Sequence, residues 1–509
     1  MLDLAGAGRY TVRAYRRAAE LVRETRAPVE ELVRAGRARE LRGIGPGIER
    51  RLQELVETGR LAELDELERE VEPALVALAR LIGMSTERLV AVGKALGIRT
   101  ADELRAAAAA GRLREVKGIG PSTEQRIVAG LAQSRPQARR GLTLDRARAL
   151  AASVAAELDG VVAGEVRRWR DLVHELAIVT TSAPDLDAAP SLVAVVEPNV
   201  AVTVEGVPVA ITVAEPGAFG TALLRATGSP AYVASLGPLP DAPTEEAVYA
   251  ALGLPYVPPE LREAPVGEPP VLVEPADVRG DLHTHTTWSD GKASVLEMAE
   301  AARARGYEYL AICDHTPNVR VVPGLDADGL RRQAEEIAAV NEIVAPFRVL
   351  RGTECDIRRD GSLDLPDDVL AELDWVQLSL HAGQREDAEL LTHKVVEAMR
   401  HPAVRCLSHP KGRIINRRPP NALQLERVLE VALETGVAIE TNGLPDRLDL
   451  RDEEVRLCVE AGVPVVCSTD AHSVRGLENM QLAVATTRRG FATAADVLNT
   501  RPLDEILRR

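Results

Sequence analysis

Aromatic residues make up only 3% of this 509-residue sequence, and none of its five cysteines forms a CxxC pair. The scarcity of aromatic side chains argues against nucleic-acid binding by base stacking. No run of about 18 uncharged apolar residues occurs, and the first residues lack the apolar core and cleavage site of a secretory signal. We therefore expect a soluble, cytoplasmic chain with reduced core cysteines at Cys313, Cys355, Cys406, Cys458 and Cys467.

Charge is distributed unevenly along the chain. The net charge is −15, which alone argues against a nucleic-acid partner. Residues 1–140, however, carry 26 Lys and Arg against 20 Asp and Glu, so the remaining 369 residues carry the whole acidic excess. The length suggests about three domains. A basic first third beside an acidic remainder allows DNA binding at one end.

Histidine is the most informative residue type, because eight of the nine histidines lie between positions 283 and 472. Six of them stand beside other metal-ligand types in the short motifs DLHTHTTWSDG, CDHT, GTECD, SLHAG, LSHP and STDAH. These motifs supply nine candidate ligands: His283, His285, Asp290, His315, Glu354, His381, His409, Asp470 and His472.

Nine nitrogen and oxygen donors are more than one ion can use, so we expect two or three divalent ions of the Zn, Mn or Fe type. Most of the motifs follow short β-type runs: YLAIC, FRVLRGT, WVQLSL, VRCLS and VPVVCST. Helical patterns such as AEEIAAVNEIV and LERVLEVALET separate these runs, which indicates βα units. Ligands after parallel strands converge on one face in a barrel active site.

The alternative for any single histidine is a hydrogen-bonded core or surface group. We keep this interpretation for His174, His393 and His401, which lie outside the motifs. For six histidines in the same position after strands, a shared metal site is the better explanation.

Residues 278–509 resemble a polymerase and histidinol phosphatase (PHP) domain, a distorted (β/α)7 barrel with three metals for phosphoester hydrolysis. The segments YEYLAICDHTPNVRVVPGLD, HPKGRIINRRPP and NGLPDRLDL are similar to the version attached to bacterial family X DNA polymerases. The resemblance implies three ions, and it makes His283, His285, Glu354 and Asp470 the catalytic core. The three ligand sets implied are His283, His285, Glu354 and Asp470; then Glu354, His381 and His409; then Asp290, His315 and His472.

A basic loop follows His409. Its cations could hold a phosphodiester beside the metals, although a solvated surface loop is an equally good interpretation. The candidates are Lys411, Arg413, Arg417 and Arg418.

The segment GIGP occurs twice in the first third, at 43–46 and 118–121. In each copy a helical pattern runs into GIGP, and an amphipathic helix follows. We expect positive φ at both glycines of each copy and helix N-termini that can bind phosphate. Both copies resemble the helix-hairpin-helix motif, which grips the DNA backbone without reading sequence. The residues implied are Gly43, Gly45, Gly47, Arg50 and Arg51, with Gly118, Gly120 and Arg126.

A third copy at 78–97 lacks the second glycine and the proline, so we expect it to be structural. Residues 1–65 are similar to the small N-terminal domain of family X polymerases, which in some relatives removes deoxyribose phosphate through a lysine. The first lysine here is Lys94, beyond that domain. Arginine cannot serve as the amine nucleophile, so we do not expect the lyase reaction.

Residues 141–263 resemble the polymerase palm, through TGS at 227–229 and TEEAVYAALGLPYVPPELRE at 244–263. The family pattern is a Gly-Ser turn followed by three Asp that hold two metals. Here the Ser is Glu165 and the three carboxylate positions are Glu175, Ala177 and Ala210. One carboxylate of three cannot assemble that site, so this palm is expected to be a scaffold.

The resemblance thus divides the chain into a helix-hairpin-helix domain (1–65), a second such region (66–140), an α+β palm (141–263), a linker (264–277) and the PHP barrel (278–509). It implies a metal-dependent 3′–5′ exonuclease, 3′-phosphatase or abasic-site endonuclease of DNA repair, without DNA synthesis. We expect a nucleoid-associated monomer that binds gapped or nicked DNA and works beside a separate polymerase and ligase. The alternatives are a small-molecule phosphatase of the histidinol phosphate type, a non-catalytic DNA-binding scaffold, and residual polymerase activity.

Overall fold

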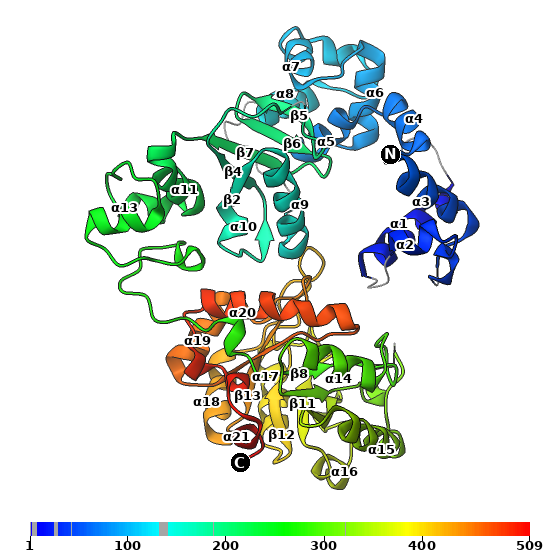
Figure 1. The fold of residues 1–509 in the computed structure, drawn as a ribbon, viewed down its shortest axis with the longest axis vertical. Coiled ribbons are helices and arrows are strands. Elements are labelled where there is room, and N and C mark those ends of the chain that lie inside the picture. Colours follow the sequence, from blue (N-terminus) through cyan, green and yellow to red (C-terminus); the bar gives the residue numbers. More distant parts are fainter. Residues whose placement is uncertain are drawn as a thin grey trace.

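The computed structural model describes residues 2, 8–24, 29–41, 43–131, 141–186, 188–320 and 322–508. The expected boundary near residue 140 lies next to residues 132–140, which are outside the described residues. Figure 1 shows the barrel at one end of the molecule, the palm next to it, and the N-terminal helices extending from the palm. Within the described residues, no helix is long and apolar enough to cross a membrane.

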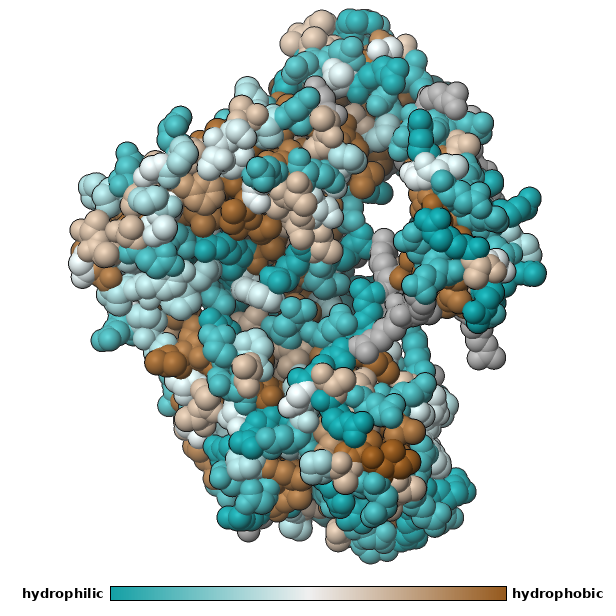
Figure 2. Space-filling model, in the orientation of Figure 1, coloured by the Kyte–Doolittle hydropathy of each residue, from teal (hydrophilic) through white to brown (hydrophobic). Residues whose placement is uncertain are grey.

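The N-terminal third is helical and has two separate apolar cores. The smaller core includes Ala38, Ile44 and Ile48, and the larger one includes Leu78, Leu89 and Ile127. Figure 2 shows an opening between the first helices and the rest of the molecule on the face in view, in agreement with their separate core. The helices are α1 (Arg9–Glu24), α2 (Val29–Arg34), η1 (Ala38–Glu40), α3 (Pro46–Thr58), α4 (Ala62–Glu70), α5 (Pro73–Ile82), α6 (Thr86–Leu96), α7 (Ala101–Ala109), η2 (Arg112–Glu115) and α8 (Pro121–Leu131).

The palm is built on a five-stranded sheet of order β2-β4-β7-β6-β5, in which β4 and β7 run parallel. Its strands are β2 (Gly160–Ala163), β4 (Leu176–Thr180), β5 (Leu192–Glu197), β6 (Val200–Thr203) and β7 (Pro208–Val213), and β1 (Leu142–Thr143) pairs separately with β3 (Leu172–Val173). The helices are α9 (Leu144–Glu157), α10 (Gly164–Arg167), η3 (Pro216–Ala218), α11 (Phe219–Thr227), α12 (Pro230–Ser235), α13 (Glu245–Leu252) and η4 (Pro259–Leu261).

The C-terminal domain is the expected barrel of seven parallel strands, in the order β8 to β14. The five strands expected from the sequence are confirmed as β9 (Tyr309–Ile312), β10 (Arg348–Asp356), β11 (Trp375–Ser379), β12 (Val404–Leu407) and β14 (Val465–Ser468). The other two are β8 (Gly280–Thr284) and β13 (Ala438–Asn442). All five cysteines are free and buried, as expected.

Helices surround the barrel, and the expected helical patterns fall in α15 and α18. The helices are η5 (Pro275–Asp277), α14 (Val295–Ala304), η6 (Pro317–Val319), α15 (Ala327–Val344), α16 (Asp367–Ala371), α17 (Ala388–Met399), α18 (Leu425–Thr435), α19 (Asp452–Ala461), η7 (Val474–Asn479), α20 (Met480–Arg489), η8 (Ala494–Asp496), η9 (Leu498–Thr500) and α21 (Leu503–Leu507). Because the strands are buried on both faces, an apolar layer lies against each face of the barrel sheet. Leu282, Ala311 and Trp375 belong to one layer, and Leu378, Val428 and Val465 to the other, which includes residues of the surrounding helices.

The barrel closes where β8 meets β14, through an asparagine rather than a full strand ladder. The Nδ2 group of Asn499 donates to the carbonyl oxygens of Gly280 and Cys467, both at 2.7 Å, and its Oδ1 accepts from the Cys467 N–H at 3.1 Å. Near the other end of β8, the His285 N–H donates to the Ala471 carbonyl at 2.9 Å. Asn499 is fully buried, so no water can replace these bonds.

We expect Asn499→Ala to destabilise the barrel by about 3 kcal/mol, because it leaves buried backbone groups without partners. Scanning calorimetry should show a lower transition temperature for the barrel, whereas Glu505→Ala, an exposed change in the same C-terminal segment, should leave it unchanged. Equal transitions in the two variants would show that Asn499 does not hold the closure.

Candidate metal centre and nucleic-acid interface

The nine candidate ligands all lie at the carboxyl end of the barrel strands, on one face. Each strand except β13 is followed by at least one of them or carries one at its end. His283 is on β8, with His285 and Asp290 after it, and Glu354 is on β10; His315, His381 and His409 follow β9, β11 and β12, and Asp470 and His472 follow β14.

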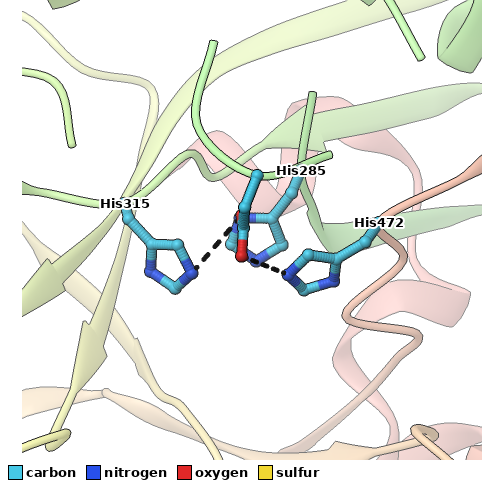
Figure 3. A group of neighbouring side chains, drawn as sticks. His285, His315 and His472 are labelled. Carbon is cyan, nitrogen blue, oxygen red and sulfur yellow. Dashed lines mark ion pairs between the residues drawn. The ribbon is translucent and has the colours of Figure 1, made fainter. Parts of the chain in front are cut away.

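One cluster consists of His285, Asp290, His315 and His472, whose ligand atoms lie within 4.8 Å of one another. The carboxylate of Asp290 is 3.2 Å from Nε2 of His472 and 3.6 Å from Nε2 of His315. Figure 3 shows these two ion pairs and the ring of His285 between the other two rings. This cluster contains the third expected ligand set and adds His285 to it.

A second cluster consists of His283, His285 and Asp470. The Nε2 atoms of the two histidines are 3.2 Å apart, and Oδ1 of Asp470 is 3.1 Å from Nε2 of His285. Two imidazole nitrogens that face each other at this distance, beside a carboxylate, are arranged to share a cation.

Glu354 joins the clusters. Its carboxylate is 2.8 Å from Nδ1 of His315, 2.9 Å from Nε2 of His409 and 3.4 Å from Nε2 of His381. It also lies 3.7 Å from Nε2 of His283 and of His285. A carboxylate at the centre of five imidazoles has the position of a ligand that bridges ions.

The donor set fits divalent ions. Among the described residues, buried Nδ1 atoms without a hydrogen bond occur at His285 and His409. A buried polar atom without a partner is costly, and a metal ion is one group that would satisfy it. Burial, together with the charge of His472, lowers the pKa of His285 to about 3, which keeps its imidazole neutral as metal binding requires.

The sequence interpretation missed Glu440, which lies on β13, the barrel strand without any of the nine candidate ligands. Its carboxylate is 2.6 Å from Nδ1 of His283, and it accepts a hydrogen bond from Gln377 at 3.0 Å and from the His409 N–H at 2.6 Å. It therefore orients two of the ligands. The available signal was a glutamate inside the apolar run VAIETN, where a charge needs a buried partner.

Two further buried aspartates hold the ligand loops. Asp314 accepts from the Thr286 N–H and from Gln333, at 2.8 and 2.6 Å, and fixes the loop after His285. Asp356 accepts from the His381 N–H at 3.0 Å and so fixes the turn after β11.

The basic loop is partly used for structure. Arg413 is buried and pairs with Asp171 of the palm at 2.6 Å, and the amine of Lys411 donates to the Leu423 carbonyl at 2.8 Å. Arg418 donates to the Gly412 carbonyl at 2.8 Å, while Arg417 is exposed. Arg417 is thus the exposed member of the loop.

The expectation of positive φ at both glycines of each hairpin was wrong for the second glycine. Gly43 and Gly118 have φ of +118° and +91°, but Gly45 has φ of −89° and Gly120 is not in the positive region. Short 3-10 turns, η1 and η2, precede the GIGP segments instead of longer helices.

The second glycines lie in open surroundings. A Cβ atom built on Gly45, Gly47 or Gly120 would meet nothing within 4 Å. Because neither φ nor packing requires glycine at Gly45 and Gly120, the missing side chain leaves room outside the chain. A phosphate could there approach the unpaired N–H groups of the helix N-terminus.

The hairpin arginines differ in exposure. Arg50 and Arg126 are exposed on α3 and α8. Arg51 instead donates to Glu63 at 2.6 Å and to the Tyr15 hydroxyl at 3.3 Å, which ties α3 to α4 and α1. Its charge is therefore already paired within the N-terminal domain.

The palm places its former carboxylate positions side by side. Ala177 on β4 and Ala210 on β7 are direct partners in the parallel register, and Glu175 precedes β4. Two arginines at the C-terminal end of α10 are paired within the palm: Arg167 makes two 2.7 Å bonds with Glu245, and Arg168 binds Glu263 at 2.9 Å. Ala177 and Ala210 thus offer no carboxylates for metals, and the guanidinium groups of Arg167 and Arg168 are engaged within the palm.

The three remaining histidines lie outside the metal-binding clusters found among the described residues. The His174 N–H binds Glu165 at 2.6 Å, His401 is 3.5 Å from Asp367, and His393 is exposed on α17.

Comparisons with known proteins agree with this architecture. Residues 1–61 match the family described as helix-hairpin-helix domain, residues 76–133 the SAM-like helix-hairpin-helix tandem, and residues 281–440 the PHP domain. The chain is 32% identical to the DNA polymerase/3′-5′ exonuclease PolX of Bacillus subtilis, over 99% of this chain and 96% of that protein. It is also 32% identical to a probable phosphatase of Acetivibrio thermocellus, over 38% of this chain and 78% of that protein.

Two solved structures match this chain at lower sequence identity. Histidinol phosphate phosphatase from Lactococcus lactis, complexed with zinc, L-histidinol and phosphate, is 14% identical with a TM-score of 0.32, over 42% of this chain and 95% of that one. Polymerase beta of Leishmania infantum is 16% identical with a TM-score of 0.22, over 38% of this chain and 99% of that one.

Proposed function

This chain belongs to the family X DNA polymerases that carry a C-terminal PHP domain, and on this basis we propose that it is a metal-dependent phosphoesterase of DNA ends that does not synthesise DNA. The candidate reactions are 3′–5′ exonuclease, 3′-phosphatase and abasic-site cleavage, all of which hydrolyse a phosphoester. The observation that carries the proposal is the convergence of nine ligands, with Glu354 at their centre, in a chain that also has two helix-hairpin-helix segments.

Each part of the metal centre has a role in such a reaction. Two or three ions of the Mn, Zn or Fe type, when bound, would polarise a phosphoryl oxygen and activate a water molecule. Glu354 is placed to bridge two sites, and Asp470, His283 and His285 would complete the first. Glu440 holds the ring of His283, so the chain itself fixes the geometry of this ligand. Because the water molecule activated by the ions would attack the phosphoryl group, no separate nucleophilic side chain is needed.

DNA would bind through its backbone. The helix N-termini after GIGP and the exposed Arg50 and Arg126 support contacts to phosphates, which carry no sequence information. Since this palm cannot fill a gap, a separate polymerase and a ligase would finish the repair, and the chain would be found with the nucleoid, acting as a monomer.

A small-molecule phosphatase is the second candidate, supported by the probable phosphatases that match 38% of this chain. The same ions would serve it. The hairpin regions oppose it, because a small substrate does not need them.

We expect Glu354→Gln to lower hydrolysis of a 3′-labelled duplex at least 100-fold, because one bridging oxygen is lost at two ions. Elemental analysis should show fewer bound ions per chain, while duplex affinity in a gel-shift assay stays within about twofold of wild type. The control is Glu389→Gln, the same substitution at an exposed glutamate on α17. Near wild-type cleavage by Glu354→Gln at saturating Mn would reject this metal site.

The two candidate functions are separated by Gly45→Val combined with Gly120→Val. Neither position has positive φ or a close neighbour, so the fold should tolerate valine while the approach of a phosphate is blocked. We expect duplex cleavage at physiological salt to fall at least tenfold, with unchanged hydrolysis of a chromogenic phosphoester. Gly267→Val, in the linker and equally open, is the matched control. An unchanged ratio of the two rates would favour the small-molecule phosphatase.

We expect no template-directed nucleotide addition with Mg or Mn, because Ala177 and Ala210 replace two of three metal-binding carboxylates. The assay is primer extension across a one-nucleotide gap with protein purified from a strain without other gap-filling polymerases. Extension that persists in Glu354→Gln, where degradation is suppressed, would contradict the loss of synthesis.

A further inference from the structure

We propose that the palm has a positioning role in the reaction of the barrel: it holds residues 443–450 so that Arg447 reaches the metal centre and binds the phosphoryl group of the substrate. This inference rests on the proposed phosphoesterase function. It assigns Arg447 to the substrate and Leu448, Arg413 and Asp171 to the support of Arg447.

Arg447 lies at the edge of the metal centre. Its Nε atom is 3.9 Å from Oδ2 of Asp470, and only 19% of its side chain is exposed. This distance is too long for a strong ion pair, so the guanidinium retains donors for another group. A phosphoryl group beside the metals presents oxygens that match the planar donor fork of arginine.

The residue after Arg447 belongs to the core of another domain. Leu448 is fully buried, and it packs in the palm cluster that contains Leu144, Val154 and Val209. Its φ is +45°, a region that leucine seldom adopts. Such a conformation persists only where the surroundings enforce it, and here the surroundings are the palm.

A buried ion pair fixes the same point from the other side. Arg413 donates to Asp171 of the palm at 2.6 Å and, through its other terminal nitrogen, to the carbonyl of Leu448. The neighbouring Ile415 packs on the palm core and donates its N–H to the Asp446 carbonyl at 2.7 Å. The basic loop and residues 443–450 are therefore docked on the palm as a pair.

The barrel end of residues 443–450 is attached to a ligand. Asn442 donates to Asp470 at 3.1 Å, accepts from the Leu444 N–H at 2.9 Å, and donates its own N–H to the Asp449 carbonyl at 2.6 Å. Residues 443–450 thus have one end at the metal centre and their middle in the palm core. The position of Arg447 therefore depends on both domains.

The test compares variants by two measurements on metal-loaded, full-length protein. These are kcat and KM for bis(p-nitrophenyl) phosphate, which avoids the DNA-binding hairpins, and the affinity for inorganic phosphate by calorimetry. We expect Arg447→Ala to weaken phosphate binding and to lower kcat/KM by at least about tenfold, the value of one charge-assisted hydrogen bond. Arg447→Lys should recover part of both, and the metal content should not change.

Leu448→Ala should reduce both quantities in the same direction, and the double variant with Arg447→Ala should be no worse than Arg447→Ala alone. The matched control is Leu482→Ala on α20, which removes another buried leucine from the same palm cluster but lies outside residues 443–450. It should retain wild-type phosphate affinity below its melting temperature. Asp171→Asn keeps the core intact and serves if Leu448→Ala does not fold; it should weaken phosphate binding as well.

The positioning role would be overturned if the effects of Leu448→Ala and Arg447→Ala on kcat/KM multiplied in the double variant. It would also be overturned if Leu448→Ala and Leu482→Ala had the same effect on phosphate affinity. Unchanged phosphate affinity in Arg447→Ala would overturn its contact with the substrate. A wild-type protein that binds phosphate through Arg447 but hydrolyses no phosphoester would instead reject the proposed function.

Discussion

The barrel depends on one electrostatic constraint: several carboxylates are buried together at one end of its strands and must be balanced by imidazoles, hydrogen bonds and cations. Glu354, Glu440 and Asp281 are each 1% exposed or less. Burial raises the pKa of Asp281 to about 7, although the Thr469 hydroxyl and nearby backbone N–H groups oppose that rise. Such a group of charges is tolerated only when each member has partners, which explains why most polar residues near the strand ends bind one another.

Most of the barrel could be predicted from the sequence because its signal is local. A ligand directly after an apolar strand is visible within about eight residues, and five strands were found in this way. β13 was missed because no candidate metal ligand follows its apolar run, and Glu440 and Asn442 did not stand out in the sequence. Their importance comes from His283 and Asp470, which are distant in the sequence and close only in the folded barrel.

The hairpins show the opposite limit. The repeated GIGP predicted two turns before helices, but it could not show which glycine of each copy has positive φ. The backbone angles separate Gly43 from Gly45, and Gly118 from Gly120. Likewise, the pairing of Arg51 with Glu63, and of Arg413 with Asp171, depends on tertiary contacts that composition does not reveal.

The palm shows which parts of a domain a chain can lose. Ala177 and Ala210 leave the sheet intact, because alanine fits the paired strands as well as aspartate does and removes a repulsion between neighbouring charges. The palm core cannot be lost in the same way, since Leu448 and Leu482 of the barrel domain are among its members. Removing the palm would expose both leucines and leave the buried Arg413 without Asp171. The barrel therefore requires the palm for its own packing, whatever chemistry the palm performs.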